Sequence, residues 1–576
     1  MMSSYFIDPN TGSDDNRGSD RDQPWRSFVP LETISLGPGD RVEILAPGSF
    51  DTSLFLKGAM GSVDDPVCVV FAPGRYDIHP EALQTRCYHI SNNNSEPEVP
   101  KRVGVLIEAS QHVVVSGPGA RLVCRAKMIV VCIDASEDVT IQDLAVDYHR
   151  PTVSEFSITS VSEDSVDIAV HADSHYSVAD GAITWQGEGW RYATGLAQEL
   201  IPETGQIWRL KDPLAGMRIE AVAPGVIRAH GTHAMTAGRV FQLRDTFRDG
   251  VGVFVRRSQR VVFDVLQLFY LHGMGIVGQL SEDITLHKVS MAPEAESGRT
   301  CSVWADSTHF SGCRGKITYT DCVFDGAHDD AINVHGTHLQ IQEVVSETCV
   351  RLRFMHRQTY GFMGVNPGDE IDFVRWDSMQ IFGTCKARDV EMIDPYELRV
   401  TFEEPIPADT RIKDVIENVT WTPEVDVTGC TIKRIPTRGF LITTRKKVLV
   451  SGNRFVRIHS NGINVESDSS NWFESGCVRD MTIRDNRFEE CGREAILISP
   501  RYAVPNSSVH QNIRITGNTF VLPEGGSAVN ACGVEGLTIT DNHIEMLAPI
   551  HGRNTIAIND CTDVVVANNA LKLLQS

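Results

Sequence analysis

Two short segments of this chain gather carboxylate and imidazole side chains at close spacing. The segment ADSTH contains Asp306, and the segment AHDDAINVHG contains Asp329 and Asp330. Three carboxylates held close together repel one another, so at least one of them keeps its proton at neutral pH. Hydrolysis of a glycosidic bond needs one carboxylic acid to protonate the leaving oxygen and one carboxylate to activate water. We therefore predict that Asp306, Asp329 and Asp330 are catalytic.

The elements that must bring these two segments together are repeated short strands. A pattern of apolar–x–apolar–x–Gly/Asp–Asn–x–apolar recurs towards the C-terminus, with successive copies mostly 23 to 33 residues apart. Alternation with a period of two is typical of a β-strand, and a repeat of this length is typical of one coil of a β-helix. The pattern predicts an all-β chain folded as a right-handed parallel β-helix. Its copies lie at 448–455, 481–488, 513–520, 537–544 and 564–571, and 425–432 is an upstream variant with Cys in place of Asn.

The repeat is interrupted twice, by stretches much longer than one coil. Both stretches contain strand-like runs separated by turn residues, so we predict two inserted antiparallel β modules, small and barrel-like. The predicted division is an N-terminal part of the β-helix over 1–150, a first insert over 151–240, coils with the catalytic residues over 241–337, a second insert over 338–422, and C-terminal coils over 423–576.

A second strand follows each repeated one, and stacking these strands by their apolar positions gives a polar column. Neighbouring parallel strands lie about 4.8 Å apart, so residues of one column are close in space. The predicted column is His272, Asp306, Asp330, Arg438, Asn461 and Glu494. We expect the outward-facing polar residues of these strands to bind substrate, with an aromatic ring under the apolar face of the sugar. The polar candidates are His309, Asn333, His335, Arg438, Asn464 and Glu466, and the aromatic ones are Trp304, Tyr360 and Trp376.

Three structural alternatives compete with the catalytic interpretation. Asp and Asn side chains commonly stack at β-helix bends, where they satisfy backbone groups. Clustered carboxylates also suit calcium, although the flanking His and Arg side chains are unsuited to that ion. A histidine on a polar face can serve only to hold a neighbour. We predict no metal and no cofactor.

Composition excludes several classes of partner. The net charge of −22 disfavours nucleic acid and anionic membranes, and no apolar run is long enough to span a bilayer. The 14 cysteines lack the spacing of a disulfide framework and are interpreted as mainly buried free thiols. The N-terminus shows no signal peptide, so the protein is expected to be cytoplasmic, or secreted after removal of a signal. The exposed inserts could mediate a homodimer.

The runs ADSTHFSGCRG and FDGAHDDAINVHG, together with the opening DPNTGSDDNRGS and PWRSF, resemble glycoside hydrolase family 110, the α-1,3-galactosidases that act on blood-group-B-type glycans. The resemblance covers most of the chain and includes the position of both inserts. It implies an inverting, metal-free exo-α-1,3-galactosidase acting on terminal galactose of branched B-type or linear Galα1-3Gal glycans. It also implies that Asp306, Asp329 and Asp330 match the catalytic carboxylates, and that the second insert supplies a further glutamate, for which Glu370 is the candidate.

Other functions for the same fold remain open at this point. A polygalacturonase-like hydrolase would need basic residues for its acidic substrate, and a lyase would need a Lys, Arg or Tyr base. A non-catalytic carbohydrate-binding β-helix would present aromatic platforms without the Asp trio. For the hydrolase, we expect Asp330 to be the general acid, with Asp306 and Asp329 holding the water. We also expect the second insert to cover the trio and leave a pocket for one sugar.

Overall fold

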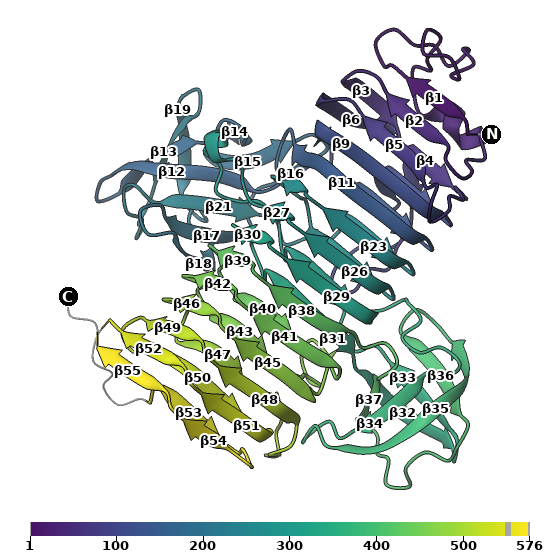
Figure 1. Ribbon diagram of the computed structural model, residues 1–576. Helices are drawn as coiled ribbons and strands as arrows, with labels where there is room; N and C mark the ends of the chain where they lie inside the picture. The colour runs from purple at the N-terminus through teal and green to yellow at the C-terminus, as the bar shows by residue number, and fades with distance from the viewer. Residues whose placement is uncertain (1, 548–553, 574–576) are drawn as a thin grey trace.

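In the computed structural model, which describes residues 2–547 and 554–573, the chain forms a long stack of parallel β-strands (Figure 1). One coil contains β26 (Glu282–His287), β27 (Ser290–Met291) and β28 (Thr308–Ser311). These strands pair in parallel with their equivalents in the next coil. The predicted parallel β-helix is confirmed. Met1 and parts of the predicted C-terminal coils, 548–553 and 574–576, lie outside the described residues.

The first face of the stack carries the repeated strands of the sequence motif, each followed in most coils by a shorter strand after a bend. Apolar side chains alternate inward along these strands and form the continuous core. The longer strands are β1 (Ser4–Ile7), β2 (Arg41–Ile44), β5 (Val67–Phe71), β9 (Gln111–Cys124), β11 (Glu137–Tyr148), β23 (Gln259–Asp264), β26, β29 (Arg314–Thr320), β38 (Glu424–Thr428), β41 (Lys447–Ser451), β45 (Asp480–Arg484), β48 (His510–Thr516), β51 (Val534–Thr540) and β54 (Val565–Ala567). The others are β3 (Gly48–Thr52), β6 (Gly74–Ala82), β24 (Gln267–Leu268), β27, β30 (Val323–Asp325), β39 (Thr431–Lys433), β42 (Arg454–Val456), β46 (Arg487–Glu489), β49 (Thr519–Leu522), β52 (His543–Met546) and β55 (Ala570–Leu573).

The second sheet of the stack carries the chemistry. Its strands begin beside the predicted catalytic column and run in parallel through most of the chain. They are β4 (Leu54–Lys57), β8 (Lys101–Glu108), β10 (Ile129–Asp134), β22 (Val251–Arg256), β25 (Met274–Gln279), β28, β31 (Ile332–Thr337), β40 (Arg438–Ile442), β43 (Asn461–Val465), β47 (Glu494–Ile498), β50 (Ser527–Cys532) and β53 (Ile556–Asn559), with β7 (Gln84–Arg86) and β44 (Glu474–Ser475) paired antiparallel at the edge. The described helices are short 3-10 turns, η1 (Val29–Thr33) and η2 (Ala295–Ser297), and neither could cross a membrane.

The Gly/Asp–Asn pair of the sequence motif forms the bend between two strands. Gly517 adopts a left-handed φ of 67°, which turns the chain. The following Asn518 is buried, and its Oδ1 accepts the backbone N–H of Asn486 at 3.0 Å. Asn518 itself donates its backbone N–H to Oδ1 of Asn542 at 2.9 Å. The motif therefore encodes an asparagine ladder that satisfies buried amides from coil to coil.

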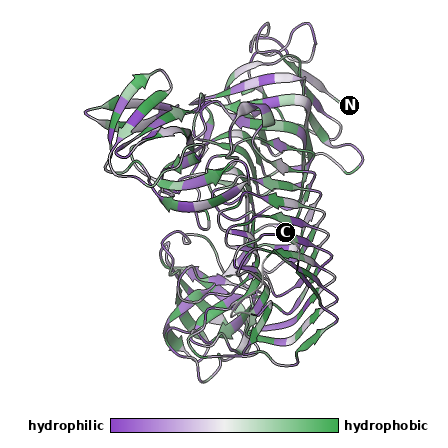
Figure 2. Ribbon diagram, turned by 90° about the vertical axis from the view of Figure 1, so that its left-hand side faces the viewer, coloured by the Kyte–Doolittle hydropathy of each residue, from purple (hydrophilic) through white to green (hydrophobic). Residues whose placement is uncertain are grey.

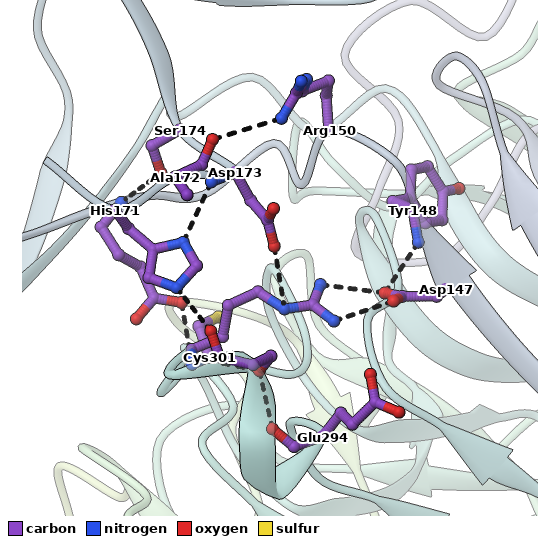
Figure 3. Close-up of polar contacts among 12 residues, drawn as sticks. Asp147, Tyr148, Arg150, His171, Ala172, Asp173, Ser174, Glu294 and Cys301 are labelled. Atoms are coloured by element: carbon purple, nitrogen blue, oxygen red, sulfur yellow. Dashed lines mark hydrogen bonds and ion pairs between the residues drawn. The ribbon is translucent and has the colours of Figure 1, made fainter. Parts of the chain in front are cut away.

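The first insert contains two antiparallel sheets and is fixed to the stack by charged contacts. Arg299, in the loop after η2, forms a pair of hydrogen bonds with Asp147 of β11, at 2.9 and 2.8 Å, and lies 3.5 Å from Asp173 of the insert (Figure 3). One charged group thus connects the β-helix to the insert. The strands are β12 (Ser154–Val161), β13 (Ser165–Val170), β14 (His175–Ala179), β15 (Ala182–Gly187), β16 (Trp190–Tyr192), β17 (Leu196–Ile201), β18 (Gln206–Lys211), β19 (Arg218–Ala223), β20 (Val226–His230) and β21 (Val240–Arg244).

The second insert is a closed antiparallel barrel with its own apolar core. Figure 2 shows both inserts projecting from the same side of the β-helix. They therefore flank one stretch of the stack, between the N-terminal and C-terminal coils. The barrel strands are β32 (Leu339–Ser346), β33 (Cys349–Arg353), β34 (Glu370–Val374), β35 (Ile381–Met392), β36 (Glu397–Phe402) and β37 (Val415–Asn418).

Candidate active site

A cavity of about 180 Å³ lies over the starts of β28, β31 and β40. The three predicted catalytic residues line it together: Asp306 is 5% exposed, Asp329 8% and Asp330 1%. The side chains around the cavity are almost all charged or polar. The remaining lining residues are Asn92, Arg209, Arg248, Asn333, Arg438, Leu441, Thr443, Glu466, Asp468, Trp472, Glu474 and Arg501.

The strand register sets the predicted column, with one correction. Thr308 pairs with Ile332, which places Asp306 level with Asp330. Later coils continue the column with Arg438, Asn461 and Glu494. The prediction of His272 was wrong, because Ile276 pairs with Thr308 and this brings Met274 level with Asp306.

Gly278 is the physical reason for this register. It lies opposite Phe310 of the next coil, and a Cβ atom at Gly278 would lie 2.3 Å from the Phe310 ring. Aligning the two strands by their glycines, Gly278 with Gly312, shifts the register by two residues. In the structure the glycine instead makes room for the neighbouring aromatic ring, and His272 lies further back, beside Trp304.

Asp330 is tightly bound to Arg438. The Arg438 Nε and Nη2 atoms donate to its two carboxylate oxygens at 3.0 and 2.6 Å, and the Arg438 backbone N–H donates to Oδ1 at 3.1 Å. Burial raises the pKa of Asp330 and the Arg438 guanidinium opposes this, but with the charges of Asp329 and Asp306 the pKa stays raised overall. Because every one of these contacts donates to the carboxylate, the arrangement satisfies its ionised form.

Asp329 faces two other arginines. Arg209 of β18 lies 2.8 Å from Oδ2, and Arg248 lies 3.3 Å from the same oxygen. Burial alone raises the pKa of Asp329, but the charges of Arg209, Arg248 and Arg438 outweigh it and hold the pKa well below its usual range. Asp329 is therefore ionised. No hydrogen bond among the described residues uses its Oδ1 atom, which leaves that oxygen available to a ligand or water.

Asp306 has a different environment. Its Oδ2 atom lies 2.8 Å from Nδ1 of His309. Burial, together with the charge of Asp329, raises the pKa of Asp306 to about 7, against the opposing effects of the nearby arginines. The trio thus contains two carboxylates paired with guanidinium groups, Asp329 and Asp330, and one, Asp306, whose pKa is raised to about 7.

His309 and His335 lie beneath Asp306 and do not line the cavity. Both are buried, and their Nε2 atoms are 3.0 Å apart. His335 also contacts the carbonyl oxygen of Gly336 through Nδ1 at 2.5 Å and lies 3.6 Å from Glu474. Burial lowers the pKa of His309 to about 4 and also lowers that of His335, so both rings are neutral.

Loops from distant parts of the chain form the wall of the cavity. Asn92 donates to Glu474 at 2.6 Å, and Thr359 of the second insert donates to Asn92 at 2.6 Å. Trp472 lies beside two neighbours: the Arg248 guanidinium is 5.6 Å from its ring centroid, and the His356 ring centroid is 4.0 Å from it. The second insert supports this wall from behind, and residues of 338–422 do not line the cavity. The expectation that this insert itself covers the trio was wrong.

The remaining predicted residues divide into two groups. Asn333 and Glu466 line the cavity, and Asn464 donates to Glu466 at 2.9 Å. Trp304 is fully buried beneath the guanidinium of Arg244 and does not line the cavity. Tyr360, stacked on Tyr396, and Trp376, which is 37% exposed, also lie outside it.

Glu370 lies outside the cavity as well. The alternation of β34 turns Ile371 and Phe373 into the barrel core, which leaves Glu370 exposed at the start of the strand, opposite Lys386. Two glutamates reach the cavity: Glu466, which was predicted, and Glu474 of β44, in the segment between β43 and β45. This segment, DSSNWFESG, interrupts the strand repeat with acidic and aromatic residues, a signal that could have identified it.

Arg209 and Arg248 were missed for a physical reason. Arg209 belongs to the first insert and Arg248 to the segment that returns from it, so neither has a place in the coil repeat. Their approach to Asp329 depends on how the insert docks. Among the described residues, no group of three or more His, Cys, Asp or Glu side chains has the arrangement of a metal site.

Comparisons with known proteins agree with this architecture. Residues 349–416 match the family model "GLAA-B beta-barrel domain II", and residues 416–544 match "Right handed beta helix region". The chain is 38% identical to alpha-1,3-galactosidase A of Akkermansia muciniphila, over 90% of this chain and 88% of that protein. It is 36% identical to alpha-1,3-galactosidase A of Bacteroides thetaiotaomicron (90% and 94% covered) and 29% identical to alpha-1,3-galactosidase B of the same organism (88% and 85%).

Proposed function

Because the chain belongs to the α-1,3-galactosidase family, glycoside hydrolase family 110, we propose that it is an inverting exo-α-1,3-galactosidase. Its substrates would be glycans with a terminal α-1,3-linked galactose, in branched B-type or linear form. The observation that carries the proposal is the unequal charge of the trio: Asp329 and Asp330 are paired with arginines, whereas Asp306 contacts a neutral imidazole. This provides one acid and one base at the same cavity.

The size and walls of the cavity support removal of a single terminal sugar. A volume of about 180 Å³ is small for a site that bound several sugar units along a groove. The loops carrying Asn92 and Glu474 are hydrogen-bonded to each other, which closes one side. A glycan would therefore enter with its non-reducing end, and the remainder would extend towards solvent.

The charge balance supports a neutral sugar. Arg209 and Arg248 are paired with Asp329, Arg438 with Asp330, and Arg501 with Glu466. These four guanidinium groups share three carboxylates, and Asp468 and Glu474 add two further carboxylates to the cavity wall. An acidic sugar, such as the substrate of a polygalacturonase, would lack an unpaired cation here and would face the additional carboxylates of the wall.

The proposed reaction breaks the bond between C1 of galactose and the glycosidic oxygen. Asp306 donates its proton to that oxygen, and rotation of its carboxyl group about Cβ–Cγ would turn the hydroxyl from His309 towards the substrate. A water molecule attacks C1 from the opposite face and passes a proton to Asp329, whose Oδ1 is unoccupied by protein donors. Asp330 remains ionised and helps to orient the water. The products are β-galactose and the shortened glycan.

This assignment replaces the expectation that Asp330 is the acid. That expectation relied on repulsion among the carboxylates, but the fork of Arg438 donates to both oxygens of Asp330. An acid must present an O–H group, which this contact disfavours. Asp306 has no comparable guanidinium contact among the described hydrogen bonds and accepts the proton instead.

Two further groups would hold the sugar. The Oδ1 atom of Asn333 is buried without a hydrogen-bond partner among the described residues, so it can accept from a galactose hydroxyl. Trp472 is the aromatic side chain among the described lining residues. We assign to it the role first expected of Trp304, that of a support for the apolar face of the ring.

Digestion of a defined set of glycans tests the proposal. The protein is incubated with the B-type trisaccharide, linear Galα1-3Gal, and α-1,4- and α-1,6-linked galactosides, and the products are separated by chromatography. Release of galactose from the α-1,3-linked substrates is the expected result. Binding without release would indicate a non-catalytic carbohydrate-binding protein, and cleavage of a galacturonide polymer would favour the polygalacturonase-like alternative.

A further inference from the structure

A continuous line of polar contacts leads from Asp306 into the interior of the protein. Asp306 Oδ2 lies 2.8 Å from His309 Nδ1, His309 Nε2 lies 3.0 Å from His335 Nε2, and His335 Nδ1 lies 2.5 Å from the carbonyl oxygen of Gly336. All of these side chains are at least 95% buried. The line therefore ends on a backbone carbonyl and not in solvent.

The carbonyl at the end of the line determines where each proton lies. A carbonyl oxygen can only accept, so Nδ1 of His335 must carry hydrogen. His335 is neutral, which makes its Nε2 an acceptor, and the Nε2 of His309 must then be the donor. This leaves Nδ1 of His309 as an acceptor facing Asp306. The contact between them is a hydrogen bond only if Asp306 supplies the proton.

We propose that His309 and His335 form a tautomeric lock that keeps Asp306 protonated, and that they act as positioning residues for the acid. The catalytic consequence rests on the proposed function above, whereas the proton arrangement itself does not. When Asp306 ionises, its carboxylate faces the lone pair of His309 Nδ1. The hydrogen of the neutral His309 ring is held on Nε2 by its hydrogen bond to His335, so Nδ1 cannot donate to the carboxylate. The lock thus favours the return of a proton to Asp306 after each turnover.

The surroundings of Asp306 show why such a lock is needed. Asp329 and burial favour the protonated form of Asp306, but Arg248, Arg438 and Arg209 favour its ionised form. Without the lock, His309 could move its hydrogen to Nδ1 and donate to an ionised Asp306. Three guanidinium groups and one imidazole N–H would then all favour the ionised form of Asp306 and lower its pKa. The other charged groups facing this line are Asp330, next to Asp306, and Glu474, whose Oε1 lies 3.6 Å from Nε2 of His335, beyond hydrogen-bond distance.

The two histidines come from neighbouring coils at offset positions. Thr308 pairs with Ile332, so His309 lies level with Asn333, and His335 lies level with Ser311. The rings meet across this diagonal with centroids 4.8 Å apart and planes at 78°. The geometry depends on the same strand register that aligns Asp306 with Asp330.

The test replaces His335 with leucine and measures kcat/KM against pH on an α-1,3-linked disaccharide. In His335→Leu, the His309 ring is released to donate to Asp306, so the pKa of the acid should fall. The alkaline limb of the profile should move down by about one pH unit or more, which is about a tenfold loss of activity above both pKa values. A uniform loss at all pH values, with an unmoved limb, would show that His335 is merely structural.

His338→Leu is the matched control. His338 follows β31, is equally buried, and donates through Nδ1 to the carbonyl oxygen of Ile416 at 3.2 Å, away from Asp306. The exchange removes the same ring from a neighbouring position. Its alkaline limb should stay at the wild-type pH. An alkaline limb that moves equally in both variants would overturn the proposal. The shift would then result from the loss of any buried ring in this region and not from the contact with His309.

Nitrogen-15 NMR of protein labelled at histidine tests the lock without any substrate. Neutral His309 should show the Nε2–H form and neutral His335 the Nδ1–H form, with signals assigned by their loss in His309→Leu and His335→Leu. The Nδ1–H form at His309 would disprove the lock even if the enzyme is active. If the tautomers are as expected but no galactoside is cleaved, the lock stands and the proposed function fails.

Discussion

Asp306 and Asp330 occupy equivalent positions on adjacent coils, yet Arg438 binds both oxygens of Asp330 whereas Asp306 contacts the imidazole of His309. One strand register therefore places two chemically identical side chains in opposite environments. A guanidinium fork favours the carboxylate, and a locked, neutral imidazole favours the carboxylic acid. The division between acid and base arises from the partners and not from the carboxylates themselves.

Asn substitutions within the trio should separate the acid from the base. Asp306→Asn and Asp329→Asn should each lower kcat/KM on the natural disaccharide, on the order of 10²–10⁴-fold. With an aryl α-galactoside, whose leaving group barely needs a proton, Asp306→Asn should retain far more activity than Asp329→Asn. If Asp330→Asn is instead the variant that retains aryl activity, the original assignment of Asp330 as the acid is restored.

The pH dependence of the wild-type enzyme should follow Asp306. Activity requires its protonated form, and its pKa is raised to about 7, so kcat/KM should be lost as the pH rises through this value. Asp329 must be ionised, and its pKa is lowered, so activity should persist below the usual titration range of a carboxylate. Stopped assays from about pH 3 to 9 provide the measurement, since this range extends below the ordinary carboxylate pKa of about 4. A profile that stays flat up to pH 9 contradicts the role of Asp306.

Removal of Arg438 should destabilise the fold as well as the site. Arg438→Met leaves Asp330 buried and unpaired, which should lower the free energy of unfolding by about 3–5 kcal/mol in a urea titration. The control is Arg484→Met, which removes an exposed ion pair with Asp485 and should cost less than about 1 kcal/mol. An equal decrease in the free energy of unfolding in the two variants would show that the buried ion pair stabilises the fold no more than the exposed one.

Trp472 should contribute to sugar binding. Trp472→Ala removes an apolar surface from the cavity, and a loss of about 1.5–3 kcal/mol of burial corresponds to a 10- to 100-fold increase in KM. Trp472→Phe should recover much of the affinity. Trp421→Ala is the control, because Trp421 packs under Arg314 outside the cavity. An unchanged KM in Trp472→Ala would rule out the platform.

The asparagine ladder should stabilise the coils without affecting catalysis. Asn518→Ala removes a buried side chain that donates to Ile483 and Asn542 and accepts from Asn486. Each buried group left unsatisfied costs about 1–3 kcal/mol. The free energy of unfolding should fall accordingly, while kcat/KM at room temperature stays at the wild-type value. A fall in kcat/KM would mean that the ladder also positions the distant site.

The repeat made much of the fold and part of the site predictable. Inward apolar residues and the Gly/Asp–Asn bend are local signals. Both recur because every coil buries apolar side chains against its neighbours and bends at the same position. Asp306, Asp330 and Arg438 could be aligned from these signals, since Asp306 and Asp330 lie two residues before β28 and β31 and Arg438 begins β40 in the same register. The position of His272 was predicted wrongly because Gly278 lies opposite Phe310, where it makes room for the aromatic ring, and not opposite Gly312.

The rest of the cavity could not be predicted in this way. Arg209 reaches Asp329 from the first insert, and Asn92 meets Glu474 across most of the length of the chain. Such contacts depend on how loops and inserts pack against the β-helix, and the sequence repeat does not predict them. The partners of Asp329 were missing from the predicted column, whereas Arg438 was already next to Asp330. The prediction of Asp330 as the acid gave repulsion among the carboxylates more weight than that arginine.

The first sugar released from an α-1,3-linked substrate tests the central claim most directly. Proton NMR during digestion of the B-type trisaccharide distinguishes the anomers before mutarotation mixes them. Direct attack of water activated by Asp329, with Asp306 as the acid, predicts that β-galactose appears first. Initial release of α-galactose would demonstrate a covalent intermediate and a nucleophilic carboxylate, and would contradict this account.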